Sequence, residues 1–265
     1  MELGGGYALL SNVIFRIVIP TILFAAIEYF PSCLLQGKEM SVSYGLYKTV
    51  GGGTYWFTSA LAVSELIILL LLLTRIKKAW FYFVACLFLG GVGMAFQHGM
   101  YAFEPWAVHR GVVALLFIGC GGMYWKYEEQ VSRIMKWYVV LLMIVAYIAI
   151  LLFCNNTNPN ISILSLQPWG IVTTLLSCLL LIELCKHLPD NRVMSYIGKN
   201  TLGIYFMSGA LPIVLSMLAH KLIPGSHLWV MLVVWVACLG IAYIVVMIIN
   251  RWLPWVFDLR MLKKR

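Results

Sequence analysis

Long apolar segments alternate with short polar segments along the whole chain. A helix needs about 20 apolar residues to cross the hydrocarbon core of a bilayer. Eight segments meet this requirement, at approximately 8–30, 55–74, 79–97, 107–125, 136–154, 168–186, 200–220 and 228–250. Continuous apolar runs are unlike the short alternating strands of a membrane β-barrel. The pattern therefore predicts an all-α, polytopic membrane helix bundle with about eight transmembrane helices.

Lysine and arginine residues are distributed unequally between alternate connections of this bundle. Fourteen lie on one side: Arg75, Lys77, Lys78, Lys126, Arg133, Lys136, Lys186, Arg192, Lys199, Arg251, Arg260, Lys263, Lys264 and Arg265. Four lie on the other side: Lys38, Lys48, Arg110 and Lys221. Cytoplasmic connections carry the excess of basic residues, and the number of predicted spans is even. We therefore expect a multi-pass protein of the cell membrane with both chain ends in the cytoplasm.

The composition agrees with a membrane bundle. Hydrophobic residues make up 62% of the chain and charged residues 11%, whereas roughly a quarter of the residues of a soluble domain are charged. The net charge of +9 comes from short connections, so we expect contacts with membrane lipids and no nucleic-acid partner. The seven cysteines form no CxxC pair, and neither a disulfide framework nor a metal site is predicted. Residues 1–265 are interpreted as a single membrane-embedded domain.

Two ionisable residues within predicted spans are candidate functional residues, because a charge inside the bilayer is costly. Arg16 lies in the first span, four residues before Pro20. Its planar guanidinium is suited to clamping a phosphate or carboxylate, and the alternative is an arginine that extends to the membrane boundary. Glu65 lies near the middle of the second span. It is either an acid, base or acceptor-site carboxylate, or a hydrogen-bonded carboxyl that ties two helices together.

Other acidic residues have less specific interpretations. Glu28 is grouped with His98, Glu104, His109 and Arg110 in a polar mouth that faces outward, or in a hydrated outer rim. Glu183 lies one helical turn before Lys186 at a predicted inner boundary, and this spacing predicts a surface ion pair.

Several stretches resemble motifs of the integral-membrane acyltransferase 3 family. Residues 16–20 read RIVIP and resemble the basic residue and LLIP that open the family's third helix. Residues 55–61, YWFTSAL, resemble its LWFLxAL signature. Residues 196–206, YIGKNTLGIYF, are similar to its late YLGKNTLGIYLLH segment. A weaker likeness covers residues 114–119, and the order and spacing of the motifs hold over essentially the whole chain.

The resemblance implies a membrane O-acyltransferase. Such an enzyme takes an acyl group, usually acetyl, from cytoplasmic acyl-CoA and delivers it to a hydroxyl of a cell-surface glycan or its lipid-linked precursor. Acyl-CoA is then a co-substrate, and no tightly bound cofactor is expected. The implied site residues are Arg16 for the CoA phosphates, Asn200 and Tyr205 in the cavity, and Trp56, Glu65 and Ser208 for the acceptor.

The chain departs from the family pattern at positions that bear on catalysis. It begins where the family's third helix begins, so we expect it to lack the first two helices and the histidine of the first. The family's double-basic RxxR corresponds here to Val13 and Arg16, and Ser208 replaces the histidine that closes IYLLH. No histidine lies in the middle of a predicted span, and the catalytic residue is left unassigned. The alternatives are an inactive truncated relative that binds glycan, lipid or a partner protein, and a small transporter.

Overall fold

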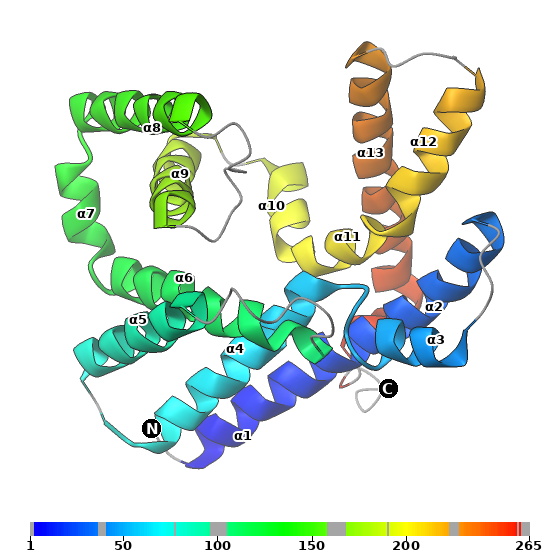
Figure 1. Cartoon of the computed structure of the whole chain (residues 1–265), viewed down its shortest axis with the longest axis horizontal. Coiled ribbons are helices and arrows are strands. Elements are labelled where there is room, and N and C mark those ends of the chain that lie inside the picture. Colours follow the sequence, from blue (N-terminus) through cyan, green and yellow to red (C-terminus); the bar gives the residue numbers. More distant parts are fainter. Residues whose placement is uncertain are drawn as a thin grey trace. The chain divides into compact units, whose positions relative to one another are not determined.

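The computed structural model describes residues 3–36, 41–76, 78–95, 105–157, 168–189, 191–222, 228–258 and 260. These residues form helices joined by turns, and no strand occurs among them (Figure 1). The prediction of an all-α fold is confirmed.

Each predicted apolar segment coincides with one helix or with consecutive helices. The first comprises α1 (Leu3–Asn12), the π-helical turn η1 (Val13–Val18) and α2 (Ile19–Gln36). The next segments are α4 (Trp56–Leu73), α5 (Ala79–Ala95), α6 (Val108–Lys126), α8 (Trp137–Thr157) and α9 (Pro168–Lys186). The seventh consists of α11 (Thr201–Met207) and α12 (Ala210–Leu222), and the eighth is α13 (Leu228–Trp252).

Four helical stretches of the described chain are long and apolar enough to cross a membrane: Tyr7–Tyr29, Trp56–Leu73, Pro105–Lys126 and Trp229–Trp252. Two bent pairs raise this number to six if each pair is one span. Glu128–Ile134 and Trp137–Phe153 meet at 88°, and Thr201–Met207 and Leu211–Ala219 meet at 47°. The described residues thus form a polytopic helical protein with four to six candidate spans, and the count of eight stays a prediction.

Short helices occupy connections for which no secondary structure was predicted. They are α3 (Val42–Thr49), η3 (Pro105–Ala107), α7 (Glu128–Ile134), α10 (Arg192–Lys199) and η4 (Pro254–Val256). The Ser41 and Asn191 side chains accept hydrogen bonds from the first turns of α3 and α10. Helix α7 has acidic residues in its first turn and Arg133 in its last, which complements the helix dipole. Local capping explains α3 and α10, and the charge pattern favours α7.

The chain divides into two compact units. Unit 1 comprises Met1–Arg75, Met100–Val112 and Asn191–Arg265, and unit 2 comprises Ile76–Gly99 and Val113–Asp190. In unit 1, buried Val13, Ile17 and Ala62 join the first apolar segment to α4. A buried hydrogen bond of 2.9 Å between the hydroxyls of Thr21 and Thr58 joins the same elements. The first segment and α4 therefore form a packed helix pair.

Close packing between α5 and α6 in unit 2 depends on two glycines. A Cβ at Gly90 would lie 2.4 Å from Leu116 Cγ, and a Cβ at Gly119 would lie 2.8 Å from Cys86 Cβ. Small residues allow membrane helices to approach each other closely, and these two positions leave no room for a side chain.

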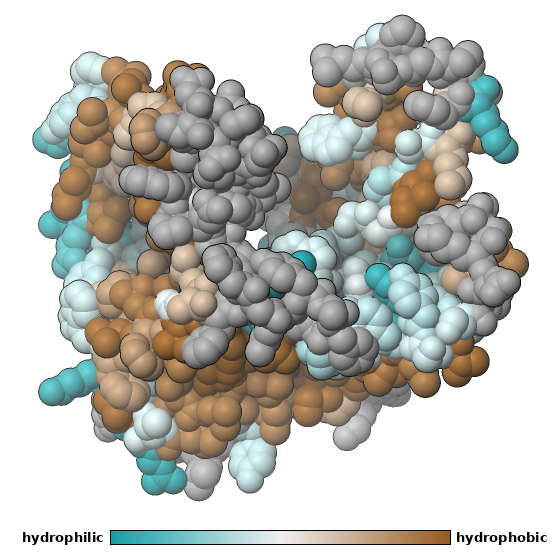
Figure 2. Space-filling model, in the orientation of Figure 1, coloured by the Kyte–Doolittle hydropathy of each residue, from teal (hydrophilic) through white to brown (hydrophobic). Residues whose placement is uncertain are grey.

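Large apolar side chains are exposed along several helices. On α13, Trp229, Leu232, Trp235 and Val236 are each more than half exposed, and α8 exposes Leu142 and Phe153 similarly. Figure 2 shows an apolar surface over α1 and α4 in the lower part of the view. Extended apolar patches of this kind mark surfaces that contact a membrane or another protein.

Candidate functional site

Arg16 lies in the π-helical turn η1, immediately before α2. Pro20 has no backbone N–H and cannot donate to the carbonyl four residues before it, which is that of Arg16. The helix widens at this point, and the Ile19 N–H bonds to the Ile14 carbonyl five residues back. Single π-helical turns of this kind occur frequently at functional sites. The proline thus helps to explain why the helix is irregular where Arg16 projects from it.

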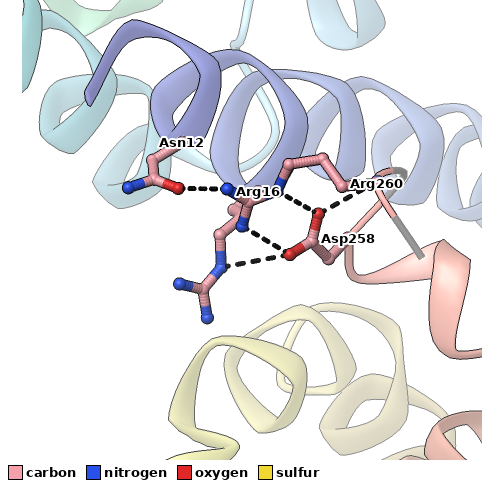
Figure 3. A network of polar contacts seen from close by, with 4 residues as sticks. All are labelled: Asn12, Arg16, Asp258 and Arg260. Carbon is pink, nitrogen blue, oxygen red and sulfur yellow. Dashed lines mark hydrogen bonds and ion pairs between the residues drawn. The ribbon is translucent and has the colours of Figure 1, made fainter. Parts of the chain in front are cut away.

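The Arg16 side chain belongs to a polar network that joins the first helical segment to the residues after α13. The network consists of Asn12, Arg16, Asp258 and Arg260 (Figure 3). Arg260 grips the Asp258 carboxylate with two hydrogen bonds, Nε to Oδ1 at 2.8 Å and Nη2 to Oδ2 at 2.6 Å. Its Nη1 also donates to the Asn12 side-chain oxygen. Arg16 Nε lies 3.6 Å from Asp258 Oδ2.

Two guanidinium groups therefore share one carboxylate, and the network carries an excess of positive charge. The Asp258 side chain is 14% exposed, and that of Arg16 is 58% exposed. The hydrogen bonds from Arg260 lower the pKa of the Asp258 carboxyl below its ordinary value. The terminal nitrogens of Arg16 point away from Asn12 and Arg260 in Figure 3. The guanidinium of Arg16 is thus accessible and carries the excess charge, and Asp258 contacts it at Nε.

Glu65, the other charged residue predicted inside a span, lies on α4. It is partly buried and close enough to Arg16 for the two charges to interact. The packing of η1 against α4 brings the residues near each other. The structure therefore places Glu65 beside the cation of the network.

Asn200 lies at the junction between α10 and α11. Its side-chain nitrogen donates to the Tyr196 carbonyl at 2.9 Å, and its side-chain oxygen accepts from Asn250 Nδ2 at 2.7 Å. Asn250 Nδ2 also donates to the Tyr196 hydroxyl at 3.2 Å. Both ends of the Asn200 amide are thus engaged in holding the α10–α11 corner against α13.

Tyr205 belongs to an aromatic cluster around the start of α4. Its ring meets those of Tyr55 and Phe57 edge to face, with centroids 5.8 and 5.4 Å apart. The buried Tyr55 donates from its hydroxyl to the Phe206 carbonyl at 2.8 Å. Phe24 stacks on Phe206 with a centroid distance of 4.7 Å. These contacts join α2, α4 and α11 into one apolar core.

Trp56 and Ser208 lie at the surface of unit 1. Trp56 is 50% exposed, and the guanidinium of Arg110 lies 4.8 Å from its ring centroid. Ser208 is exposed at the end of α11, where its hydroxyl donates to the Tyr205 carbonyl at 2.6 Å. All six predicted site residues belong to unit 1. Arg16 on η1 and Glu65 on α4 are close enough for their charges to interact, and Tyr205 lies in the aromatic cluster.

Sequence reasoning missed Asp258, Arg260 and the surroundings of Glu28. Asp258 and Arg260 follow the last apolar segment, where the basic residues were interpreted only as a topology signal. The sequence offered one signal for this network, the acidic Asp258 between the basic residues Arg251 and Arg260. The sequence places Glu28 in an outward-facing polar mouth or a hydrated outer rim, but its Oε2 atom is buried and has no hydrogen-bond partner. Of the residues grouped with it, His98 and Glu104 lie outside the described residues.

The Glu183–Lys186 pair in unit 2 is present, with 3.1 Å between Lys186 Nζ and Glu183 Oε1. The prediction that it lies at the surface is wrong for the acid, because the Glu183 side chain is only 6% exposed. Lys186 Nζ also donates to the Tyr124 and Ser132 hydroxyls at 2.7 and 2.6 Å and lies 3.2 Å from Glu128 Oε1. Residues from α6 and α7 thus enclose the pair, which spacing along α9 alone does not reveal.

Comparison with known proteins gives one finding. The model of the acyltransferase 3 family, described as an acyltransferase domain, matches residues 5–251. Neither the curated proteins nor the solved structures give a match. The matched region contains the three motif-like stretches at 16–20, 55–61 and 196–206, and it covers nearly the whole chain. The chain therefore belongs to the acyltransferase 3 family of membrane proteins.

Proposed function

We propose that the protein is a membrane O-acyltransferase that moves an acetyl group from cytoplasmic acetyl-CoA to a hydroxyl of a cell-surface glycan or its lipid-linked precursor. The family match supports acyl transfer in a membrane. The observation that carries the choice of donor is the accessible guanidinium of Arg16, which Asp258 contacts at Nε in the network formed by Asn12, Arg16, Asp258 and Arg260. The donor is consumed in each turnover, so it is a co-substrate and not a resident cofactor.

The network suits the phosphate groups of CoA. A guanidinium offers a planar fork of donors that matches phosphate oxygens. Arg260 is committed to Asp258 through two hydrogen bonds. Arg16 uses only its Nε side toward Asp258, and its terminal nitrogens make no hydrogen bond with the described part of the chain. Arg16 is therefore assigned to the phosphates, and Asp258 to holding Arg16 in place.

The remaining site residues are assigned to the acyl passage and the acceptor. Asn200 and Tyr205 belong to the α11 region that packs beside α2 and α4, and they shape the apolar passage for the thioester arm. Trp56 and Ser208 are exposed and are assigned to the glycan. Glu65, whose charge interacts with Arg16, is assigned to substrate binding as a hydrogen-bonding carboxyl. An exposed indole ring provides an apolar face on which a sugar ring can stack.

The proposed membrane arrangement follows the charge pattern of the sequence. Eight spans with both ends in the cytoplasm put the residues after α13 on the cytoplasmic side of the cell membrane. Asp258 and Arg260 then lie on the side from which acetyl-CoA arrives. The ion pair between Arg16 and Asp258 supports an entrance for the donor at that side.

Transfer of label from acetyl-CoA tests the proposal. The full chain in membranes that contain surface glycan is supplied with acetyl-CoA labelled in the acetyl group, and labelled glycan ester is measured. We expect transfer by the wild type and a large loss in Arg16→Ala. Arg133→Ala is the control, because the Arg133 side chain is 81% exposed and lies on α7 of unit 2. A folded wild-type chain that transfers no label in the presence of acceptor would overturn the proposal.

A further inference from the structure

Glu28 has an unusual environment for a carboxyl group. It lies near the end of the candidate span Tyr7–Tyr29, on α2. Among the described residues, its Oε2 is the buried side-chain polar atom that lacks a hydrogen-bond partner. Buried polar groups in native proteins are nearly always hydrogen-bonded, and an exception calls for an explanation. A role in binding or chemistry is one such explanation.

The carboxyl group faces the break between α11 and α12. A Cβ added to Gly209 would lie 2.4 Å from Glu28 Oε2 and 2.8 Å from its Cδ. Gly209 lies between the two arms of the pair that is bent by 47°. Irregular backbone inside a membrane is tolerated where it is buried in protein or lines a cavity. The absence of a side chain at Gly209 is thus what admits the carboxyl group to this break.

Nearby hydroxyl groups direct their closest hydrogen bonds to backbone carbonyls. The Tyr55 hydroxyl is close enough to interact with the Glu28 carboxyl group, but its hydrogen bond of 2.8 Å goes to the Phe206 carbonyl. Ser208, next to Gly209, donates to the Tyr205 carbonyl. Glu28 Oε2 therefore keeps its capacity to accept a proton, at a point where four helices (α2, α4, α11 and α12) come together.

Glu28 and the donor-binding residue Arg16 belong to the same helical segment. Twelve residues separate them, which corresponds to about 18 Å along a helix at 1.5 Å per residue. An extended pantetheine arm, which joins the phosphates of CoA to its sulfur, spans a distance of this order. With the phosphates at Arg16, the thioester reaches the neighbourhood of Glu28.

We propose that Glu28 is the general base of the acyl transfer, an inference that rests on the proposed function. The acceptor hydroxyl oxygen attacks the thioester carbonyl carbon while its proton passes to Glu28 Oε2. The new C–O bond forms, the C–S bond breaks, and the sulfur leaves with the electron pair. The CoA thiolate then takes the proton from Glu28, which returns to the carboxylate. The products are the glycan ester and the CoA thiol.

This assignment places the base within the described part of the chain. A general base must reach the proton that it removes. Glu28 Oε2 is covered by the turn at Gly209. In the proposed reaction the acceptor hydroxyl meets the carboxylate at the break between α11 and α12.

Two substitutions of Glu28 separate a catalytic role from a structural one. Glu28→Gln keeps the size of the side chain and removes the base, whereas Glu28→Asp keeps the base and shortens the side chain. If Glu28 is the catalytic base, turnover should fall about 10²- to 10⁴-fold in Glu28→Gln. Glu28→Asp should then keep more turnover than Glu28→Gln. A packing role predicts the opposite order. Glu129→Gln is the matched control, since the Glu129 side chain is 90% exposed.

Binding of labelled CoA to each variant, measured without acceptor, shows whether the donor site is intact. We expect Glu28→Gln to bind CoA as the wild type does while its turnover falls. Turnover of Glu28→Gln at the wild-type level would overturn the role of Glu28 and leave the proposed function standing. If the wild type itself transfers no acetyl group, both proposals fall. If Glu28→Gln does not bind CoA, Glu28→Asp takes its place in the comparison with the wild type. A Glu28→Asp variant that binds CoA but transfers no acetyl group would refute the proposal.

Discussion

Arg16, in the first apolar segment, and Asp258, beyond the last, form an ion pair with 3.6 Å between Arg16 Nε and Asp258 Oδ2. The pair connects residues from opposite ends of the chain within unit 1. Arg260 binds the same carboxylate with two hydrogen bonds. Asp258 is thus fixed by Arg260 and in turn positions Arg16. The segment after α13 is thereby part of the donor site that we propose.

Asp258→Asn should weaken the binding of acetyl-CoA. The substitution removes the negative charge that both guanidinium groups face, and Arg16 and Arg260 then repel each other. The Arg16–Asp258 ion pair is 3.6 Å long and the Arg16 side chain is 58% exposed. Exposed pairs contribute at most about 1 kcal/mol, so we expect the acetyl-CoA concentration at half-maximal rate to rise by up to about fivefold. Turnover at saturating donor should change less. An unchanged donor dependence would contradict the positioning role of Asp258.

The stability that Asp258 contributes should depend on pH in a defined direction. The hydrogen bonds from Arg260 lower the pKa of Asp258 in the folded protein. A carboxyl with a lowered folded-state pKa stabilises the fold fully above its unfolded pKa, which is about 3.9, and this contribution is lost as the pH falls through the folded value. The difference in melting temperature between wild type and Asp258→Asn should be constant from about pH 5 upward and shrink below about pH 4. A difference that vanishes near pH 6 would exclude this origin.

Gly209→Ala should destabilise the protein and reduce turnover together. The new Cβ would lie 2.4 Å from Glu28 Oε2, so either the carboxyl group or the turn must move. Overpacking of this kind costs about 1–3 kcal/mol. Gly121→Ala is the control, because a Cβ there meets nothing within 4 Å. Thermal unfolding and acetyl transfer measure the two effects, and a Gly209→Ala variant as active as Gly121→Ala would refute the tight contact with Glu28.

The fold was largely predictable, because the length and continuity of apolar runs determine where membrane helices form. The site was predictable only in part. RIVIP identified Arg16, but its partner Asp258 depends on how the end of the chain folds back, which periodicity does not encode. Glu28 has the sequence neighbours of a boundary residue, and its buried oxygen depends on the approach of Gly209 and other residues distant in the sequence. Likewise, α3 and α10 begin at the local caps Ser41 and Asn191, which hydropathy does not register.

Membrane topology provides an independent prediction. Reporter fusions after Lys78, Lys136 and Lys199 should be cytoplasmic and those after Lys48 and Asn158 external, because the two sets of connections differ in basic residues by fourteen to four. Two or more reversed positions would exclude eight spans with both ends inside. Such a result would favour a count within the four to six candidate spans of the described residues.

Lys186→Met should destabilise unit 2 without a direct effect on the proposed site. Lys186 Nζ contacts the Tyr124 and Ser132 hydroxyls and the Glu183 and Glu128 carboxylates. Its removal leaves Glu183, whose side chain is 6% exposed, without a cation. Breaking a buried pair costs about 3–5 kcal/mol, and we expect the lower end of this range because the Lys186 side chain is 31% exposed.

Arg133→Met is the control, since its pair with Glu129 is exposed and 3.9 Å long, and such pairs contribute at most about 1 kcal/mol. Thermal unfolding in detergent measures both variants, and equal melting temperatures for the two would show that the Lys186 cluster does not hold α6, α7 and α9 together.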